Sequence, residues 1–233
     1  MYQKAETERL VRELNDDQVR EDYKRPYDNH AIHFFPRAVG AVLIFFGNVV
    51  YGKKPSYAKF RAIEVIARVP YQSWVSAAYT LLTLFYSNEQ KAIELSHLSK
   101  YARLAQDNET MHVVVISTLA KKQGKSNVLT YTIIPMLFAF LYFWAAYILY
   151  LLSPRYSHEV NYLFENHAFE QYTEFLTANE TELKEKPISS EFLTWYGRYP
   201  RNQYEFFEQV RNDELIHRNT SAHVLVAGTQ TNF

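Results

Sequence analysis

Glutamate and histidine residues separated by three positions are the feature of this 233-residue sequence that could do chemistry. The chain contains three such pairs, which are Glu94–His97, Glu109–His112 and Glu214–His217. Residues i and i+3 share a helix face, so each pair can offer a carboxylate and an imidazole to one metal ion. One pair alone is a weak indication, because the spacing also arises by chance.

Two isolated glutamates extend this pattern because they lie in apolar helical stretches. Glu64 stands in Ala-Ile-Glu-Val-Ile-Ala, and Glu165 in Tyr-Leu-Phe-Glu-Asn-His-Ala-Phe. A glutamate in such a stretch is seldom buried unless it is paired or bound to metal, and the alternative is that it faces solvent. Two lone glutamates and two Glu-x-x-His pairs on four helices form the ligand set of carboxylate-bridged di-iron bundles. Carboxylate and imidazole without thiolate favour iron or manganese over zinc or copper.

The composition excludes several other kinds of chemistry. The chain has no cysteine, which rules out disulfides, zinc–thiolate sites, iron–sulfur clusters and thiol catalysis. Its 6 glycines form no G-x-G-x-x-G or Walker pattern that would bind phosphate groups. Lys+Arg and Asp+Glu are 25 each, and no basic stripe is visible, so we expect no nucleic-acid partner.

Polar and apolar blocks alternate along the chain, and their periodicity is helical rather than strand-like. Mean hydropathy is −0.30 although 48% of the residues are hydrophobic. Helical or apolar segments are expected at residues 38–51, 62–86, 88–122, 128–152, 156–178 and 204–220, with a connector over 181–202. Gly124 is a plausible end for the segment that begins at residue 88. The sequence therefore predicts an all-α fold.

Two uncharged segments are apolar enough to contact a membrane. Residues 38–51 are too short to span a bilayer comfortably and suit a helix in the membrane interface. Residues 128–152 are long enough to span it. Alternatively, residues 128–152 form a buried or membrane-surface helix of a bundle, because Pro135 and many tyrosines interrupt the apolar run.

The N-terminal segment 1–28 is polar, carries charges of both signs and contains no apolar core. This pattern is not that of a secretory signal, and its acidic residues argue against a transit peptide. We expect a solvated polar arm over 1–28, a di-iron helical bundle with membrane-binding helices over 29–220, and a C-terminal tail over 221–233.

Four motifs carrying these glutamates stand in order along the chain. They are Ile-Glu-Val-Ile-Ala-Arg-Val-Pro-Tyr (63–71), Asn-Glu-Thr-Met-His (108–112), Glu-Asn-His-Ala-Phe-Glu-Gln-Tyr (165–172) and Asp-Glu-Leu-Ile-His (213–217). Together with Leu-Leu-Ser-Pro-Arg (151–155), they resemble the alternative oxidases, and most of all the plastid terminal oxidase branch. The resemblance extends over residues 56–220, and it is the combination of motifs that makes it specific.

The resemblance implies a ferritin-like four-helix bundle with two iron ions, monotopic on the membrane and dimeric. The implied iron ligands are Glu64, Glu109, His112, Glu165, Glu214 and His217. The pair Glu94–His97 falls outside the family's motifs and is expected on the surface. Tyr172 matches a tyrosine close to the di-iron site, which is a candidate redox partner for the metal. The residues that match polar neighbours of the ligands are Asn108, His158 and Asp213.

The implied activity is that of a quinol oxidase, which reduces dioxygen to water with electrons from a quinol and pumps no protons. Ile63 and Lys59, which replaces the family's usual arginine, mark the implied quinol pocket. The isoprenoid tail of a quinol calls for a site that opens toward lipid. The cations that could attract anionic headgroups near such a surface are Arg37, Lys53, Lys54, Lys59 and Arg61.

The physiological donor stays open between plastoquinol and ubiquinol. The plastid-like motif favours plastoquinol, but the connector between Tyr172 and Glu214 is shorter than in plastid enzymes. The implied location is the cytoplasmic side of a bacterial inner or thylakoid membrane. Two alternatives remain, a di-iron quinone-ring hydroxylase and a non-catalytic iron-binding protein of the membrane surface.

Overall fold

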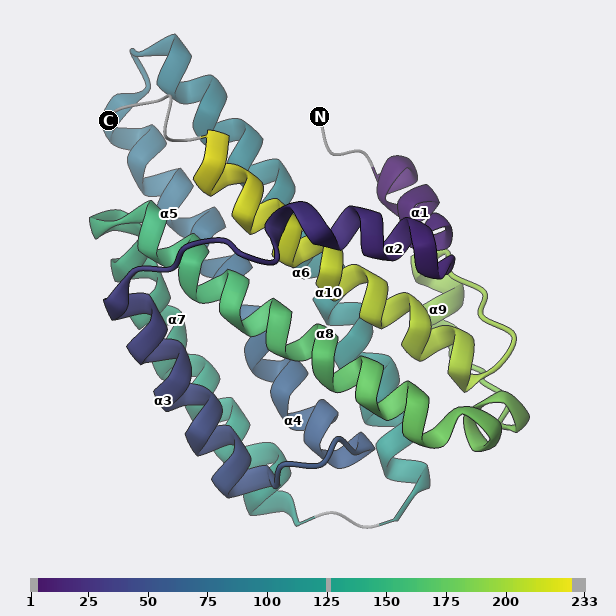
Figure 1. Cartoon of the computed structure of the whole chain (residues 1–233). Helices are drawn as coiled ribbons and strands as arrows, with labels where there is room; N and C mark the ends of the chain where they lie inside the picture. Colours follow the sequence, from purple (N-terminus) through teal and green to yellow (C-terminus); the bar gives the residue numbers. More distant parts are fainter. Residues whose placement is uncertain (1–3, 125–126, 228–233) are drawn as a thin grey trace. The chain divides into compact units, whose positions relative to one another are not determined.

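The computed structural model describes residues 4–124 and 127–227, and these residues are helical apart from short connections and one isolated bridge between Pro187 and Asn202 (Figure 1). The expected all-α class is confirmed. The described chain divides into two compact units. The first unit contains residues 57–157, and the second contains residues 5–56 and 158–227.

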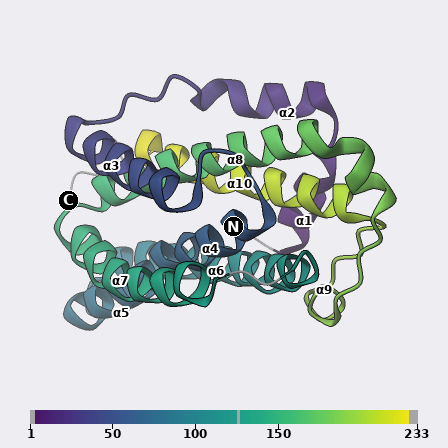
Figure 2. The same cartoon turned by 90° about the horizontal axis from the view of Figure 1, so that it is seen from below.

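The first unit is built from helices that pack in pairs. Its helices are α4 (Tyr57–Ala67), α5 (Val69–Phe85), α6 (Glu89–Lys122) and α7 (Ile134–Leu152), with a π-helical turn over Leu129–Ile133 before α7. Both α4 and α5 pack against α6 and α7 (Figure 2). Buried aromatic side chains fill the space between them, namely Tyr71, Trp74, Tyr101 and Tyr150.

Proline and capping residues set the helix boundaries of the first unit. The apolar segment expected over 62–86 divides at Arg68 into α4 and α5, and both Arg68 and Pro70 interrupt its apolar run. Pro70, near the start of α5, has no N–H to donate, and its ring would clash with a carbonyl four residues back. Asn88 caps α6 by accepting the Lys91 N–H at 3.0 Å. Gly124 follows α6 with φ of +132°, which confirms the expected end.

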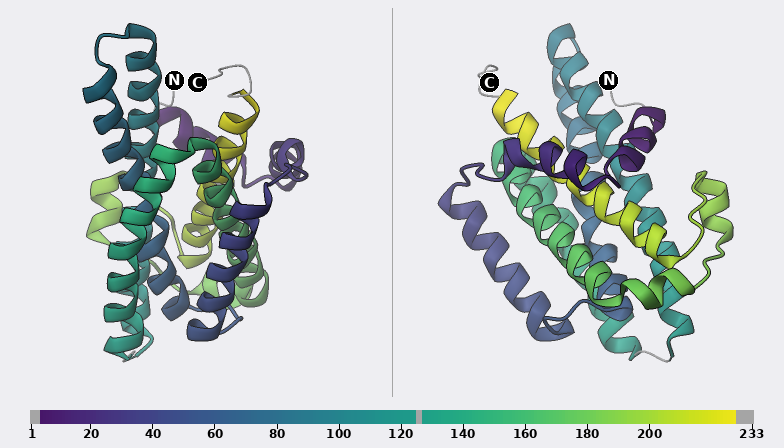
Figure 3. Two further views of the ribbon diagram at one scale, coloured as in Figure 1. Left: turned by 90° about the vertical axis from the view of Figure 1, so that its left-hand side faces the viewer. Right: turned by 45° about the vertical axis from the view of Figure 1, so that its right-hand side comes forward.

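The second unit places two long helices side by side. Its helices are α1 (Lys4–Glu13), α2 (Asp17–Lys24), α3 (Phe34–Tyr51), most of α8 (Pro154–Glu185), α9 (Glu191–Tyr196) and α10 (Gln203–Ala227), with a 3-10 turn over Arg25–Tyr27. Helices α8 and α10 run alongside each other (Figure 3), and the ring centroids of Phe175 on α8 and Phe207 on α10 are 5.0 Å apart. The expected connector over 181–202 contains α9 and the end of α8.

Only part of the N-terminal segment is solvated as expected. Val11 and Leu14 of the first described turns are buried against Phe169, Leu215 and Ile216. At the other end, α10 continues to residue 227, so the position at which the tail is expected to begin lies inside a helix. Residues 1–3 of the expected arm and 228–233 of the expected tail lie outside the described residues.

Two helical segments have the length and apolar composition of membrane-contacting helices. They are Phe34–Tyr51 in the second unit and Leu129–Leu152 in the first, and only 11% of each is buried. The most exposed side chains include Phe45 and Phe46 on α3 and Phe140 on α7. The exposed side chains of α7 agree with the membrane-surface alternative for residues 128–152, and the part of α7 that is buried is limited to Pro135, Ala146 and Tyr150.

Helix α3 is held against α8 at two places. At its start, the buried carboxylate of Glu159 accepts the His33 backbone N–H at 3.0 Å and lies 2.7 Å from the ring Nδ1. Further along, Gly40 approaches α8 so closely that a Cβ atom there would lie 2.9 Å from Leu163 Cδ1 and 3.5 Å from its Cβ. A small residue at position 40 is therefore part of what seats α3.

We expect Gly40→Leu to lower the free energy of unfolding of detergent-solubilised protein by about 1–3 kcal/mol, because the added side chain overpacks the contact with Leu163. Gly47→Leu is the matched control on the same helix, where an added Cβ meets nothing within 4 Å. Denaturant unfolding followed by circular dichroism measures both. Equal midpoints for the two variants would show that α3 is not seated through Gly40.

Candidate metal centre

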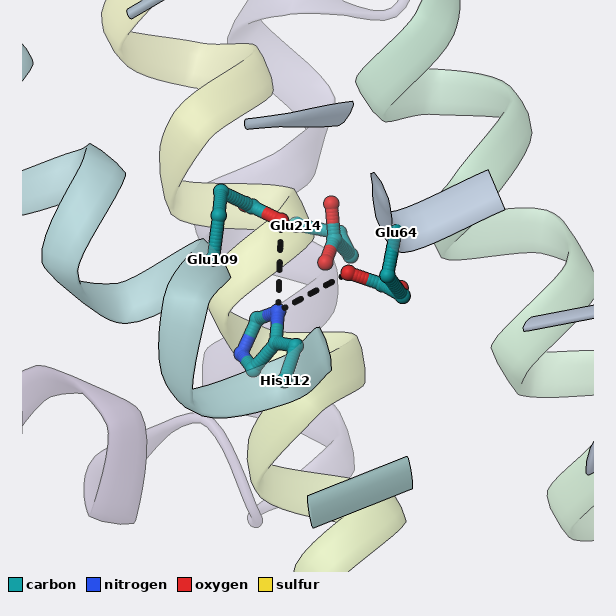
Figure 4. Close-up of side chains that lie close together, drawn as sticks. All are labelled: Glu64, Glu109, His112 and Glu214. Carbon is teal, nitrogen blue, oxygen red and sulfur yellow. Dashed lines mark ion pairs between the residues drawn. The ribbon is translucent and has the colours of Figure 1, made fainter. Parts of the chain in front are cut away.

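The first unit brings together three of the expected ligands. Glu64 comes from α4, and Glu109 and His112 come from successive turns of α6. His112 Nδ1 lies 3.5 Å from Glu64 Oε2 and 3.4 Å from Glu109 Oε2 (Figure 4). All three side chains are at most 2% exposed, and their ligand atoms lie within 4.8 Å of one another.

The second unit contains a triad of the same composition. Glu165 comes from α8, and Glu214 and His217 come from successive turns of α10. These side chains are 1–4% exposed, and one ligand atom of each lies within 4.8 Å of those of the other two. Each unit therefore provides one lone glutamate and one Glu-x-x-His pair. We call these groups the first triad and the second triad.

Both triads have the donor atoms and the charge that suit a hard divalent cation. In the first triad, the separations of 3.4–3.5 Å between the imidazole nitrogen and the carboxylate oxygens are long for a hydrogen bond. They are about the distance between two atoms that are each bound to one ion at about 2 Å. The two carboxylates of a triad would be neutralised by one divalent ion, and oxygen with imidazole donors suits iron or manganese. Metal binding by these residues stays a prediction.

Asn161 orients a carboxylate of the second triad. Its Nδ2 donates to Glu165 Oε1 at 3.1 Å and to Ser221 Oγ at 3.2 Å, and all three residues are buried. An amide that fixes a ligand carboxylate in this way limits its rotation and tunes its basicity. The sequence analysis missed Asn161, although it stands four residues before Glu165 and therefore on the same helix face.

Asp213, expected as a polar neighbour of the ligands, forms a buried ion pair with Arg198. Arg198 Nη2 donates to Asp213 Oδ1 at 2.8 Å, and its Nε donates to Glu8 Oε2 at 2.9 Å. Burial disfavours the guanidinium charge, but the two carboxylates outweigh burial and hold the pKa of Arg198 above its usual range. Arg198 was missed because it lies in the stretch expected to be a connector.

The other expected site residues fall into two groups by burial. Asn108, His158 and Tyr172 are each at most 5% exposed, and the Tyr172 ring packs 6.1 Å from Phe207. Their roles stay predictions. Glu94 and His97, in contrast, are exposed on α6, as expected for the pair outside the family's motifs.

The two candidates for the quinol pocket both lie on α4. Ile63 is half-buried, and Lys59 is only 1% exposed. The expectation that Lys59 faces lipid headgroups is wrong, because its side chain is buried. Lys53 and Lys54 are exposed just after α3, and Arg37 is exposed near its start.

Buried carboxylate–imidazole triads on paired helices are typical of helical-bundle proteins whose metal ligands project from the helices. The chain belongs to the alternative oxidase family, whose profile, described as "Alternative oxidase", matches residues 15–225. That family is membrane-associated and monotopic, and it carries two iron ions.

Curated relatives agree with this membership. Over 185 residues the chain is 27% identical to "Ubiquinol oxidase 4, chloroplastic/chromoplastic" of Arabidopsis thaliana. This alignment covers 71% of the chain and 50% of the relative. Over 117 residues the chain is 26% identical to "Ubiquinol oxidase 2, mitochondrial" of Glycine max, in an alignment that covers 49% of this chain and 34% of the relative. The chain thus spans half or less of the length of these relatives.

Burial of His158 should make the stability of the metal-free protein fall in acid. Burial lowers the pKa of His158 from its ordinary value of 6.5 to about 4. Between pH 6.5 and 4 the His158 side chain binds a proton in the unfolded chain but stays neutral in the folded chain. The free energy of unfolding therefore falls as the pH falls toward 4. Between pH 7.5 and 4.5 we expect a loss of about 2–3 kcal/mol from this residue.

Unfolding in denaturant at several pH values, with a chelator present, measures this loss. His158→Gln should flatten the acid limb, whereas His97→Gln, which changes an exposed histidine on α6, is the control. If the two variants show the same acid limb as the unaltered chain, His158 does not carry the pH dependence.

Proposed function

We propose that this protein is a quinol oxidase that carries two iron ions and that its iron ligands are the six residues of the two triads. The observation that carries the proposal is the matching composition of the triads: each unit provides one lone glutamate and one Glu-x-x-His pair. A carboxylate-bridged di-iron centre in a four-helix bundle requires two such sets on four helices, and here the ligand helices are α4, α6, α8 and α10. When bound, the iron pair would supply the redox chemistry between a quinol and dioxygen.

The net reaction consumes two quinols and one dioxygen and yields two quinones and two waters. The carboxylate and imidazole groups of the six candidate ligands are buried, and a centre enclosed in this way limits the escape of reactive oxygen species. Asn161 keeps the Glu165 carboxylate in one orientation. Tyr172 stands two helical turns after Glu165 on α8, and we propose its buried phenol as a redox partner of the centre.

The substrate is proposed to reach the protein from a lipid surface. The relatives' names describe ubiquinol oxidases, and a quinol with an isoprenoid tail is dissolved in the membrane. The exposed apolar faces of α3 and α7 suit contact with lipid, and Lys53 and Lys54 add positive charge for anionic headgroups. Ile63 and Lys59 are the candidates for quinol contact. A homodimer on the cytoplasmic side of a bacterial inner or thylakoid membrane, without proton pumping, completes the proposal.

Oxygen uptake by purified, iron-loaded protein tests the proposed activity. With a short-tail ubiquinol or plastoquinol as donor, we expect cyanide-insensitive uptake that Glu214→Ala abolishes, because the second triad loses a ligand. Glu94→Ala is the matched control, since it removes an exposed glutamate from a Glu-x-x-His pair of the same spacing. The ratio of rates with the two quinols identifies the preferred donor.

Product analysis separates the proposal from its alternatives. Quinone and water as the products support an oxidase, whereas oxygen inserted into the quinone ring would identify a hydroxylase. Two irons per chain without quinol-dependent uptake would instead indicate a non-catalytic iron-binding protein. A chain that binds no iron would overturn the metal centre itself.

Contact with lipid through α3 is tested by vesicle sedimentation. Phe45→Asp and Phe46→Asp should each weaken binding to anionic vesicles about tenfold or more, because a phenyl group buried in lipid contributes about 1.5–3 kcal/mol. Trp195→Asp is the control, since Trp195 is exposed on α9 rather than on an apolar helix. Equal losses in all three variants would argue against α3 as the membrane contact.

A further inference from the structure

Residues of α10 that stand next to the candidate ligands are bonded to the N-terminal segment. Asn212 donates from Nδ2 to the Val11 carbonyl at 2.9 Å and to Asn15 Oδ1 at 2.7 Å. Two helical turns later, Asn219 Nδ2 donates to the Tyr23 carbonyl at 2.7 Å. These bonds lie on either side of the pair Glu214–His217, and Figure 1 shows α2 lying across α10.

The two residues between the ligands contact the same segment by their apolar side chains. Leu215 and Ile216 are buried in one cluster with Val11 and Leu14 of the N-terminal segment. On a helix, Leu215 and Ile216 project away from the face that carries Glu214 and His217. The N-terminal segment therefore covers the back of the ligand turn.

Two buried arginines link ligand neighbours to carboxylates of the N-terminal segment. Arg198 bridges Asp213, which adjoins Glu214, to Glu8 of α1, where both Nε and Nη2 donate to the carboxylate at 2.9–3.1 Å. The guanidinium is 3% exposed and the Glu8 side chain 18%, so water screens this contact little. The Asp213 carboxylate accepts from Nη1 and Nη2 of the same guanidinium, so Nη2 donates to both carboxylates.

Arg218, which adjoins His217, repeats this arrangement. Its Nη1 donates to Asp28 Oδ1 and to Asn166 Oδ1, both at 3.0 Å, and its Nη2 donates to the Lys24 carbonyl at 2.8 Å. Asn166 in turn adjoins Glu165 on α8. Arg218 is fully buried, and these partners fix its planar group in one position.

We propose that residues 8–28 are a positioning element for the ligand pair Glu214–His217, and that Glu8 is a positioning residue that acts through Arg198 and Asp213. This inference rests on the proposed metal centre. The carboxylate of Glu8 holds the guanidinium in place, the guanidinium holds Asp213, and Asp213 sets the rotation of the turn that carries Glu214. Residues that support ligands in this way tune metal affinity without touching the metal.

The test uses the full chain loaded with iron and measures the rate at which a ferrous chelator removes the metal. Glu8→Gln, which keeps the shape of the side chain and removes its charge, should release iron about tenfold faster. Glu13→Gln on the same helix is the matched control, because it removes the charge of a glutamate whose ion pair, with Arg9, is exposed. The visible spectrum of the Co²⁺-loaded protein should change in Glu8→Gln and not in Glu13→Gln.

A double-mutant cycle checks the route of the effect. Since Glu8 acts through Arg198 on Asp213, Glu8→Gln should add nothing to the release rate of an Asp213→Asn variant. Additive effects would overturn this route. Amide hydrogen exchange of the metal-free protein gives an independent measurement, in which Glu8→Gln should speed exchange at residues 211–219. Loss of protection throughout the second unit would show a general structural role and overturn the inference.

Failure of the inference is distinguishable from failure of the proposed function. Unchanged iron release and an unchanged Co²⁺ spectrum in Glu8→Gln, with iron bound by the unaltered chain, would overturn only the positioning role. An unaltered chain that binds neither iron nor Co²⁺ would overturn the metal centre and the positioning role together.

Discussion

The burial of carboxylates inside helical units is the constraint on which the rest of this structure depends. Moving an isolated ionised carboxylate out of water costs several kcal/mol, and each triad contains two with a single imidazole. Such a group is stable only if charge and hydrogen bonds arrive from elsewhere. The polar residues buried on α8 and α10, such as Asn161 and Asp213, meet that need by fixing orientations, and a divalent cation would balance the remaining charge.

The sequence predicted what is local and missed what depends on distant partners. Glu-x-x-His spacing is set by the helix itself, so both pairs in the triads were predictable, yet Glu94–His97 has the same spacing and is exposed. Only burial separates them, and burial is decided by tertiary packing. The contact from Arg198 to Glu8 joins residues 190 positions apart, which no local pattern encodes. The break before α5, by contrast, falls at Arg68 and Pro70, where the sequence itself interrupts the apolar run.

The N-terminal segment shows how charge can conceal packing. Most of its residues are charged or polar, which is typical of a solvated helix, and few apolar residues are available to bury. Two of them, Val11 and Leu14, pack directly behind the turn that carries Glu214 and His217. Several of its polar groups, in turn, bond to Arg198, which precedes α10, and to Asn212, Arg218 and Asn219 of α10. A polar surface segment therefore contributes order to a buried site, because buried polar side chains need partners and the segment supplies them.

Hydropathy likewise identifies apolar helices without saying what they contact. A helix that is apolar on all sides is either enclosed by protein or exposed to lipid. In α3 and α7 little of the surface is enclosed by protein, since 11% of each apolar segment is buried and large side chains such as Phe45 and Phe140 are exposed. Exposure of this much apolar surface to water would favour aggregation. Contact with lipid would remove that penalty, and this is the physical ground for the proposed membrane contact of both helices. Under the proposed function, the same apolar faces would also meet a substrate whose isoprenoid tail is dissolved in the membrane.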